Sequence, residues 1–317
     1  MVFTQLATVH TYYHKDMPID VLFLGGTSID LIQKSRGPAS AFFTASVGGG
    51  ITNSSIIAAK LGLKVAMLSR IGKDSLGDWA IKELARIGVN TRGIIHDPSI
   101  RTPLAVANID RYGNSRYTFY KNSPKDSIVP LISAPKDLLN SCKAFHFGSS
   151  FSYQKESSEE ALKYVKYLKK RGAFISFDPN LRPYAIKDKK AAKNRVLSFL
   201  EWVDLARFSE IDLKFLFGQK SLKKRLECEV VLTRGAKGSE YLPQPSLRGA
   251  KRRSNLIKVP APKVKVVDTI GAGDAFNAAL LYRIVKTGGR QVFKNIKPHL
   301  IFASKIASQI CTKSGAH

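Results

Sequence analysis

The chain has 317 residues and 44% hydrophobic content, enough to bury a substantial core, so its composition is that of a globular protein. Its longest apolar stretches are strand-sized and its three cysteines are far apart, which excludes membrane spans, a disulfide framework and a zinc site. The net charge of +27 is large, but the basic residues lie singly or in short clusters such as 169–171, 223–225 and 251–253, which favours solvated surfaces over a nucleic-acid site.

Residues 1–18 contain no basic segment followed by an apolar one, so no secretory signal is predicted and we expect a cytoplasmic protein. Beyond them, short apolar runs alternate with helical patterns. The runs predicted as strands are 20–25, 64–71, 142–148, 173–178, 203–208 and 229–233. Between them, 76–87 and 157–171 place apolar residues on one helical face, and each segment is followed by glycine. This alternation predicts one α/β domain over residues 1–317, with a doubly wound, mostly parallel sheet flanked by helices.

Two stretches break this alternation. In 41–47 and 102–121 apolar residues alternate with polar ones, the second stretch around a turn at 112–114. They predict a small antiparallel sheet, with strands contributed by residues 27–47 and 100–122. Because ligands of doubly wound folds bind at the carboxyl ends of the parallel strands, such a sheet is placed to act as a lid over the site.

Residues 264–285 run from a strand through a glycine-rich turn into a helix and carry the strongest chemical signal. Gly271, Ala272 and Gly273 allow backbone N–H groups to approach a ligand, and the helix N-terminus adds positive potential. Asp274 follows in the first helical turn. A carboxylate there can accept a proton from an attacking hydroxyl while the amides stabilise a transferred phosphoryl group, although a helix-capping acid after an ordinary turn has the same local pattern.

A second glycine-rich turn contains Gly48 and Gly49 and leads to Asn53 near a predicted helix start. Alone it is a common structural pattern. Together with 268–276, D-T-I-G-A-G-D-A-F, it resembles the two signatures of the ribokinase-like (PfkB) carbohydrate kinases, with motifs most similar to those of fructokinases and 2-keto-3-deoxygluconate kinases. Further similar segments are 25–30, which resembles the family's first strand and turn, 177–183, 233–238 and 311–316.

The resemblance implies a ribokinase-like fold with a β lid and an ATP-dependent sugar kinase, a phosphotransferase that uses ATP and Mg²⁺ on a fructose- or keto-sugar-type substrate. It makes Asp274 the general base and Gly271, Ala272 and Gly273 the anion hole. The substrate-binding residues that it implies are Asp30, Gly48, Gly49, Asn53 and Arg182. The nucleotide-binding residues that it implies are Thr233, Gly235, Gly238 and Ser209. Carboxylates suit vicinal sugar hydroxyls, and a guanidinium suits an anion.

Metal sites follow from the same resemblance, with departures. The residues that correspond to a monovalent cation site, taken as K⁺, are Asp268, Ile270 and Gly315. The family's N-x-x-E element, which acts on magnesium through water, reads S-E-I-D at 209–212, so its acid is the shorter Asp212. The pair Y-K at 120–121 stands where keto-acid kinases carry Y-R, and losing the bidentate guanidinium favours a neutral sugar over a sugar acid.

Two other functions stay open. A nucleoside kinase of the same fold needs aromatic residues that stack on a base, and Phe42, Phe43, Tyr117 and Phe119 are available, although alternation on a sheet explains them equally well. A non-catalytic relative that binds nucleic acid or acts as a scaffold would use the charge of +27, but an intact Asp274 argues against it. We therefore expect a sugar and ATP as partners, no membrane or nucleic acid, and, by resemblance, a homodimer formed through the lid.

Overall fold

The computed structural model describes residues 18–36, 39–109, 115–120, 128–218, 222, 226–244, 256–313 and 315–317. The turn expected at 112–114, Lys121 and the basic clusters 223–225 and 251–253 lie outside these residues. None of the described helices has the length and apolarity that a bilayer crossing requires.

The main sheet has nine strands in the order β13-β12-β11-β10-β9-β8-β1-β4-β5 within the described residues. Its strands are β1 (Val21–Leu24), β4 (Val65–Gly72), β5 (Val89–Asp97), β8 (Ala144–Gly148), β9 (Phe174–Asp178), β10 (Leu205–Ser209), β11 (Glu229–Thr233), β12 (Ser239–Leu242) and β13 (Ile257–Val259). Neighbours from β5 to β11 pair in parallel, whereas β12 and β13 add antiparallel pairs at one edge. The predicted mostly parallel sheet is confirmed. The sequence did not reveal β5, because this edge strand is half polar.

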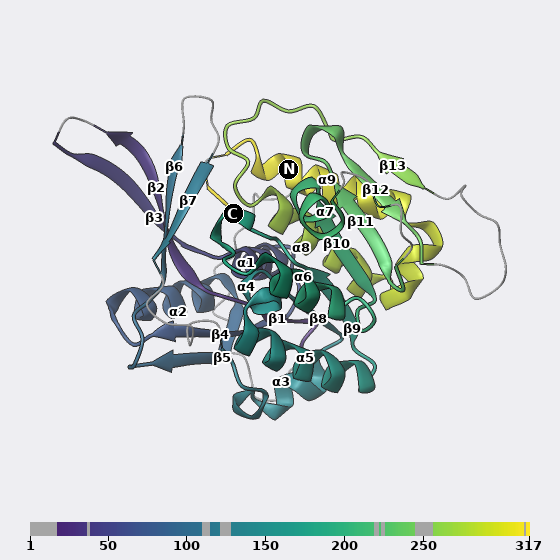
Figure 1. The fold of residues 1–317 in the computed structure, drawn as a ribbon, viewed down its shortest axis with the longest axis horizontal. Helices are drawn as coiled ribbons and strands as arrows, with labels where there is room; N and C mark the ends of the chain where they lie inside the picture. Colours follow the sequence, from purple (N-terminus) through teal and green to yellow (C-terminus); the bar gives the residue numbers. More distant parts are fainter. Residues whose placement is uncertain are drawn as a thin grey trace.

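Helices cover both faces of the main sheet (Figure 1). They are α1 (Gly50–Lys60), α2 (Ser75–Ile87), α3 (Lys136–Ser141), α4 (Ser150–Tyr153), α5 (Lys155–Lys170), α6 (Lys189–Ser198), α7 (Glu210–Phe217), α8 (Ala272–Lys286) and α9 (Lys297–Ile310). Short 3₁₀ segments are Leu131–Ser133, Pro183–Ala185, Gly235–Lys237 and Gly289–Asn295. Along β1, Val21 and Phe23 face the core under α1 and α8, and Leu22 and Leu24 face the core under α5. Side chains alternate in this way because successive residues of a strand point to opposite faces.

A smaller sheet stands apart on one side of the molecule (Figure 1). Its order is β3-β2-β6-β7, and its strands are β2 (Ser28–Arg36), β3 (Ala41–Gly48), β6 (Leu104–Ile109) and β7 (Ser115–Tyr120). The pairs β2–β3 and β6–β7 are antiparallel, but β2 and β6 are parallel, so the prediction of an antiparallel sheet is wrong for this pair. The chain passes through the main fold between β3 and β6, and such a crossover returns the strand in the same direction as β2.

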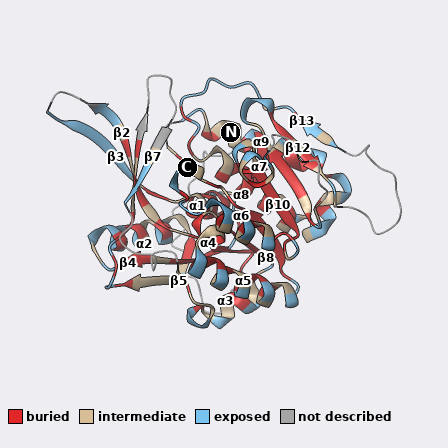
Figure 2. Ribbon diagram, viewed as in Figure 1, coloured by how far each residue is buried: buried red, intermediate tan, exposed pale blue. Residues whose placement is uncertain are grey.

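The main sheet changes its winding direction beside β1. The chain moves from β1 to β4 and β5 on one side and then to β8 on the other, so the carboxyl ends of β1 and β8 flank a topological switch point. The small sheet begins at β2, three residues beyond β1, and its base therefore lies at this edge. Strands of the main sheet are largely buried, while most of β3 is exposed (Figure 2).

Candidate active site

The N-terminus of α8 forms a backbone cradle. Gly271 precedes the helix with a φ of 77°, in the left-handed region that glycine adopts readily. A Cβ there would lie 2.5 Å from the carbonyl oxygen of Ala316, so the position requires glycine. Of the amides of Ala272, Gly273 and Asp274, only the first donates to a carbonyl within the described part of the chain, that of Thr269 at 3.3 Å. The other two stay available to an anion at the positive end of the helix.

Asp274 is a buried carboxylate in this cradle and is 8% exposed. Its Oδ2 accepts a hydrogen bond of 3.0 Å from Nδ2 of Asn53. Burial raises the pKa of the Asp274 carboxyl to about 6; the Asn53 hydrogen bond opposes this shift, and the charge of Asp178 increases it. The positive charges of Arg182 and Arg207 also lower the pKa of this group. A carboxyl with such a pKa is matched to accepting a proton near neutral pH.

The start of α1 lies against Asp274. A Cβ on Gly50 would be 2.6 Å from Asn180 Nδ2, 3.2 Å from Asp274 Oδ1 and 3.4 Å from Ser149 Oγ, so these side chains surround one point. Ser149 (φ 51°) and Asn180 (φ 40°) are the non-glycine residues with positive φ in the described chain, and they are the first residue after β8 and the second residue after β9. Such backbone strain is concentrated at functional sites. Sequence reasoning missed Gly50, Ser149 and Asn180 as site residues.

Asp30 belongs to β2 of the small sheet. The segment 25–30, which resembles the family's first strand and turn, runs from the end of β1 at Leu24 into β2, which starts at Ser28 and falls within the lid segment predicted at 27–47. Asp30 is 6% exposed, and its Oδ1 accepts a 3.0 Å hydrogen bond from Ser28 Oγ. Burial raises the pKa of Asp30 to about 7, and the negative charge of Asp274 acts in the same direction, so the two carboxyl groups influence each other across the site.

The predicted sugar-binding glycines pack against neighbouring groups. A Cβ on Gly48 would lie 2.1 Å from Cγ of Asp30, so the Asp30 side chain covers this glycine. Gly49 has a φ of 105°, and a Cβ there would lie 2.3 Å from the carbonyl oxygen of Gly26. Asn53 then follows on α1, with its Oδ1 buried and without a partner among the described residues. The turn therefore brings Asp30, both glycines and Asn53 beside the α8 cradle.

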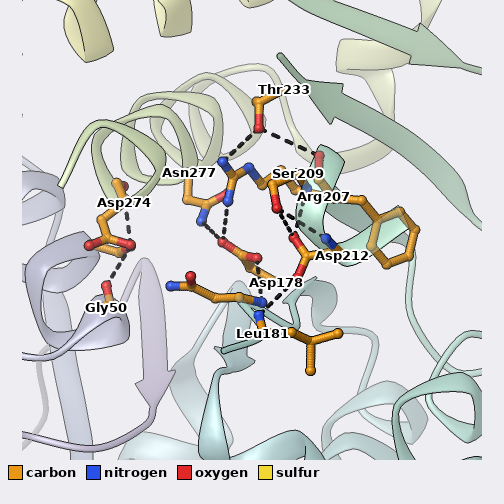
Figure 3. Close-up of polar contacts among 12 residues, drawn as sticks. Gly50, Asp178, Leu181, Arg207, Ser209, Asp212, Thr233, Asp274 and Asn277 are labelled. Carbon is orange, nitrogen blue, oxygen red and sulfur yellow. Dashed lines mark hydrogen bonds and ion pairs between the residues drawn. The ribbon is translucent and has the colours of Figure 1, made fainter. Parts of the chain in front are cut away.

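A buried polar network adjoins the cradle (Figure 3). Asp178, at the end of β9, is 0% exposed, and its Oδ2 accepts hydrogen bonds from Arg207 Nη1 at 2.8 Å and Asn277 Nδ2 at 2.6 Å. Arg207 Nη2 donates to Thr233 Oγ1 at 2.6 Å. The network thus joins β9, β10, β11 and α8.

Two members of this network, Arg207 and Asn277, were not predicted as site residues. A signal for each exists in the sequence. Arg207 is a charge inside an apolar strand run, and arginine is seldom buried unless it is paired. Asn277 stands three residues after Asp274, on the same side of the helix.

Three of the four predicted nucleotide residues, Thr233, Gly235 and Gly238, lie at the turn between β11 and the antiparallel β12. Thr233 ends β11, and the amide of Arg234 donates to the carbonyl of Gly238 at 2.8 Å. Gly235 and Gly238 have φ values of 53° and 91°, and a Cβ on Gly238 would lie 2.0 Å from the carbonyl oxygen of Val259. The turn leaves the carboxyl end of a parallel strand, on the same edge of the sheet as Asp178.

Ser209 and Asp212 form a capping box at the start of α7. Asp212 Oδ2 accepts from the amide and hydroxyl of Ser209 at 2.7 and 2.5 Å, and its Oδ1 accepts from the amide of Leu181 at 2.8 Å. At 1% exposed, Asp212 therefore fixes the segment that carries Arg182. Arg182 Nη1 in turn donates to Asn180 Oδ1 at 2.5 Å.

The three residues predicted for a monovalent cation lie together before α8. Asp268 Oδ1 accepts from the amide of Ile270 at 2.8 Å, and Oδ2 accepts from the amide of Gly315 at 3.1 Å. Asp268 is 7% exposed, and its own amide donates to the carbonyl of Cys311 at 3.3 Å. This carboxylate therefore ties the C-terminal segment to the loop that leads into the cradle.

Comparisons with known proteins agree with this architecture. Residues 19–317 match the model of the pfkB family carbohydrate kinases. Fructokinase-1 of Oryza sativa subsp. japonica is 30% identical over 308 residues that cover 93% of this chain and 93% of that protein. A sugar kinase of Pyrococcus horikoshii solved in complex with ATP is 26% identical, with a TM-score of 0.80 and 93% of both chains covered. A fructokinase of Vibrio cholerae solved with fructose, ADP and calcium is 26% identical, with a TM-score of 0.79 and 94% of both chains covered.

These matches extend over the two sheets and both helical layers, so the predicted ribokinase-like fold and phosphotransferase class are confirmed. Both glycine-rich turns, around Gly48 and Gly271, fall within the matched residues. The chain belongs to the pfkB family of carbohydrate kinases.

Proposed function

We propose that this carbohydrate kinase transfers the γ-phosphoryl group of ATP to a hydroxyl of fructose or a related neutral keto-sugar, with Asp274 as the general base. The observation that carries the proposal is the placement of a buried carboxyl of pKa about 6 in the first turn of α8, beside two amides with no acceptor in the described chain. The rice, Pyrococcus and Vibrio relatives support the nucleotide and the sugar class. Residues 1–317 act as one kinase domain.

The reaction is a single displacement at phosphorus. The sugar hydroxyl oxygen attacks the γ-phosphorus, its proton passes to Asp274, and the bond to the bridging oxygen breaks so that ADP leaves. The amides of Gly273 and Asp274, which have no acceptor in the described chain, stabilise the negative charge that spreads over the transferred group, and Gly271 and Ala272 form the turn that places them. Arg182 supplies a further positive charge on the side of the anion.

Substrate and nucleotide occupy the two sides of this cradle. Asp30 and Asn53 form hydrogen bonds with sugar hydroxyls. Oδ1 of Asn53, which is buried without a partner among the described residues, accepts a hydrogen bond from one of these hydroxyls. Gly48 and Gly49 shape the sugar side of the site, because Gly48 leaves room for the Asp30 side chain and Gly49 leaves room for the carbonyl of Gly26. The nucleotide contacts the turn of Thr233, Gly235 and Gly238, with Ser209 at the adjacent strand end.

Magnesium fits this site as part of the nucleotide complex. The described residues contain no group of three or more acidic, histidine or cysteine side chains arranged to hold a metal. Mg²⁺ commonly binds through phosphates and water with few protein ligands, and there it neutralises phosphate charge. Asp212, whose oxygens already hold Ser209 and Leu181, would influence such an ion only through water.

Potassium fits the loop around Asp268. A buried carboxylate and the backbone carbonyl groups near Ile270 and Gly315 are hard oxygen donors of the kind that K⁺ prefers. A bound cation would strengthen the loop before α8. Because Asp268 already holds both segments through amide hydrogen bonds, we expect potassium to stimulate the reaction rather than to be essential.

The small sheet serves as a lid and as the surface of a homodimer. Phe42, Phe43, Phe119 and Tyr120 on β3 and β7 are 69%, 42%, 41% and 57% exposed, which is unusual for aromatic side chains. The double variant Phe42→Ser with Phe119→Ser is expected to lower the mass measured by light scattering from that of a dimer to that of a monomer. A wild type that is monomeric at all protein concentrations would remove the dimer proposal.

The cytoplasmic location stays a prediction.

The test of the function is ADP release with ATP and magnesium across fructose, 2-keto-3-deoxygluconate, ribose and adenosine. We expect fructose or another neutral keto-sugar to stimulate ADP release most, and Asp274→Asn to abolish the stimulation. Stimulation by adenosine alone would favour a nucleoside kinase. No stimulation by any acceptor, with equal rates for wild type and variant, would refute the proposal for this panel.

A further inference from the structure

Arg207 is a charged side chain inside the main parallel sheet. It stands on β10 between Ala206 and Phe208, which are both 0% exposed, and is itself 8% exposed. A guanidinium at such a depth must be paired, because its desolvation is otherwise costly. Its Nη1 donates to Asp178 at 2.8 Å and its Nη2 donates to Thr233 at 2.6 Å, while Nε is buried without an acceptor in the described chain.

The guanidinium lies against the anion cradle. A Cβ on Gly273 would be 2.8 Å from Nη2, 3.1 Å from Nη1 and 3.2 Å from Cζ of Arg207, so the group packs on the first turn of α8. This is the positive end of a helix, where a second positive charge is repelled. The pairing with Asp178 offsets this repulsion without an anion present. With the anionic phosphates in the cradle, the helix end and the guanidinium attract the same ligand.

We propose that Arg207 is a positioning residue for phosphoryl transfer, which holds the nucleotide turn and the anion cradle together and places a fixed positive charge behind the transferred group. The inference rests on the proposed roles of Asp274 and the α8 amides. One side chain then contacts three parts of the site: Thr233 on the nucleotide side, Gly273 in the anion hole, and Asp178 at the end of β9.

The planar fork of arginine explains the choice of residue. Two separate nitrogens reach Asp178 and Thr233 at once, and the same two nitrogens lie against Gly273. A lysine would provide the charge but only one nitrogen. We therefore expect Arg207→Lys to keep the electrostatic effect and to lose part of the positioning.

The charge of Arg207 also acts on Asp274, which gives a readout beyond activity. The charged and titratable groups that influence or face Asp274 are Asp30 on β2, Tyr117 on β7, Asp178 on β9, Arg182 after β9, and Arg207 on β10. Removing the positive charge in Arg207→Met should move the acidic limb of the pH profile of kcat/KM upward by about one pH unit. Loss of the cation behind the phosphoryl group should lower kcat by about 10²-fold.

Arg207→Met leaves the buried Asp178 carboxylate without its positively charged partner, so the variant could unfold for that reason alone. The double variant Asp178→Asn with Arg207→Met removes both charges and avoids this problem. Its acidic limb should return toward that of the wild type, because one negative and one positive neighbour of Asp274 disappear together, while kcat should stay at least about tenfold low. Arg207→Lys should keep the wild-type limb.

Arg70 offers a matched control. Its side chain is also largely buried and pairs with Asp97 while donating to the carbonyl of Ile128 at 2.7 Å, away from α8. Arg70→Met should lower thermal stability without moving the acidic limb. An unchanged limb and an unchanged kcat in folded Arg207→Met would overturn the inference while leaving the proposed function intact. Full activity of Asp274→Asn would instead refute the proposed function on which the inference rests.

Discussion

The side-chain amide of Asn53 donates a 3.0 Å hydrogen bond to Oδ2 of Asp274 across a sequence separation of 221 residues. This bond joins the first turn of α1 to the first turn of α8, and Ser54 strengthens the junction by donating to the backbone carbonyl of Asp274 at 3.1 Å. Two helix N-termini therefore meet at the proposed base. Their combined positive potential favours the anionic ligand that a kinase must hold.

Asp274→Asn should lower kcat by about 10²–10⁴-fold, because the amide cannot accept the hydroxyl proton. The protein should nevertheless stay folded, since a neutral amide is easier to bury than a carboxylate and still accepts the Asn53 hydrogen bond. The measurement is steady-state ADP release together with thermal unfolding of the same samples. Asp188→Asn is the matched control, because Asp188 caps α6 at the surface and asparagine caps a helix equally well. Equal losses of activity in both variants would contradict the assignment.

Asp30→Asn should make stability less dependent on pH. Burial raises the pKa of Asp30 from 3.8 to about 7, so the folded protein holds this proton more tightly than the unfolded chain. The wild type therefore loses stability as pH rises from about 4 to about 7, by on the order of a few kcal/mol, while below this window the group has no effect. Urea unfolding across this range should show the variant gaining on the wild type as pH rises. A difference that is constant with pH would contradict the buried protonated state.

Gly50→Ala should damage the site without unfolding the protein. The new methyl group would meet Asn180 Nδ2 at 2.6 Å and approach Asp274 Oδ1 at 3.2 Å. Because a displaced base loses its alignment, we expect kcat/KM for the sugar to fall by about 10²-fold. Gly172→Ala is a useful control: its φ of 83° strains the backbone but nothing lies within 4 Å of the new Cβ. That control should lose stability by about 1 kcal/mol and keep its activity. Full activity in Gly50→Ala would show that the site tolerates the methyl group.

Asp268→Asn should make the enzyme insensitive to potassium. Initial rates of the wild type, measured in potassium chloride and in choline chloride at equal ionic strength, should be higher with potassium by a few-fold, because the cation strengthens the loop before α8. In Asp268→Asn the two salts should give the same rate. A wild-type rate that is identical in both salts would remove potassium from the proposed cofactors.

The sequence predicted the fold and named many residues of the candidate site, because the signals for both are local. Alternating apolar runs identified the main parallel strands, and the glycine-rich turns identified both helix starts that meet at Asp274. The pairing directions in the small sheet were harder to predict, because the direction of β6 relative to β2 depends on the path of the chain between these two strands. For Asp212, the sequence predicted a role at magnesium through water, which stays a prediction, and the structure adds that its carboxylate closes a capping box with Ser209 and accepts a hydrogen bond from the distant amide of Leu181.

By itself the sequence determined which segments bury apolar faces and where glycine must allow a tight turn, because periodicity and backbone freedom are properties of neighbouring residues. Only the tertiary structure decided which distant groups share a charge environment. The raised pKa of Asp274 arises from burial together with residues such as Asp178, and the pairing of Arg207 with Thr233 joins strands that the sequence treats separately. Electrostatic interactions in a buried site depend on distance through space, and the distance along the chain does not reveal them.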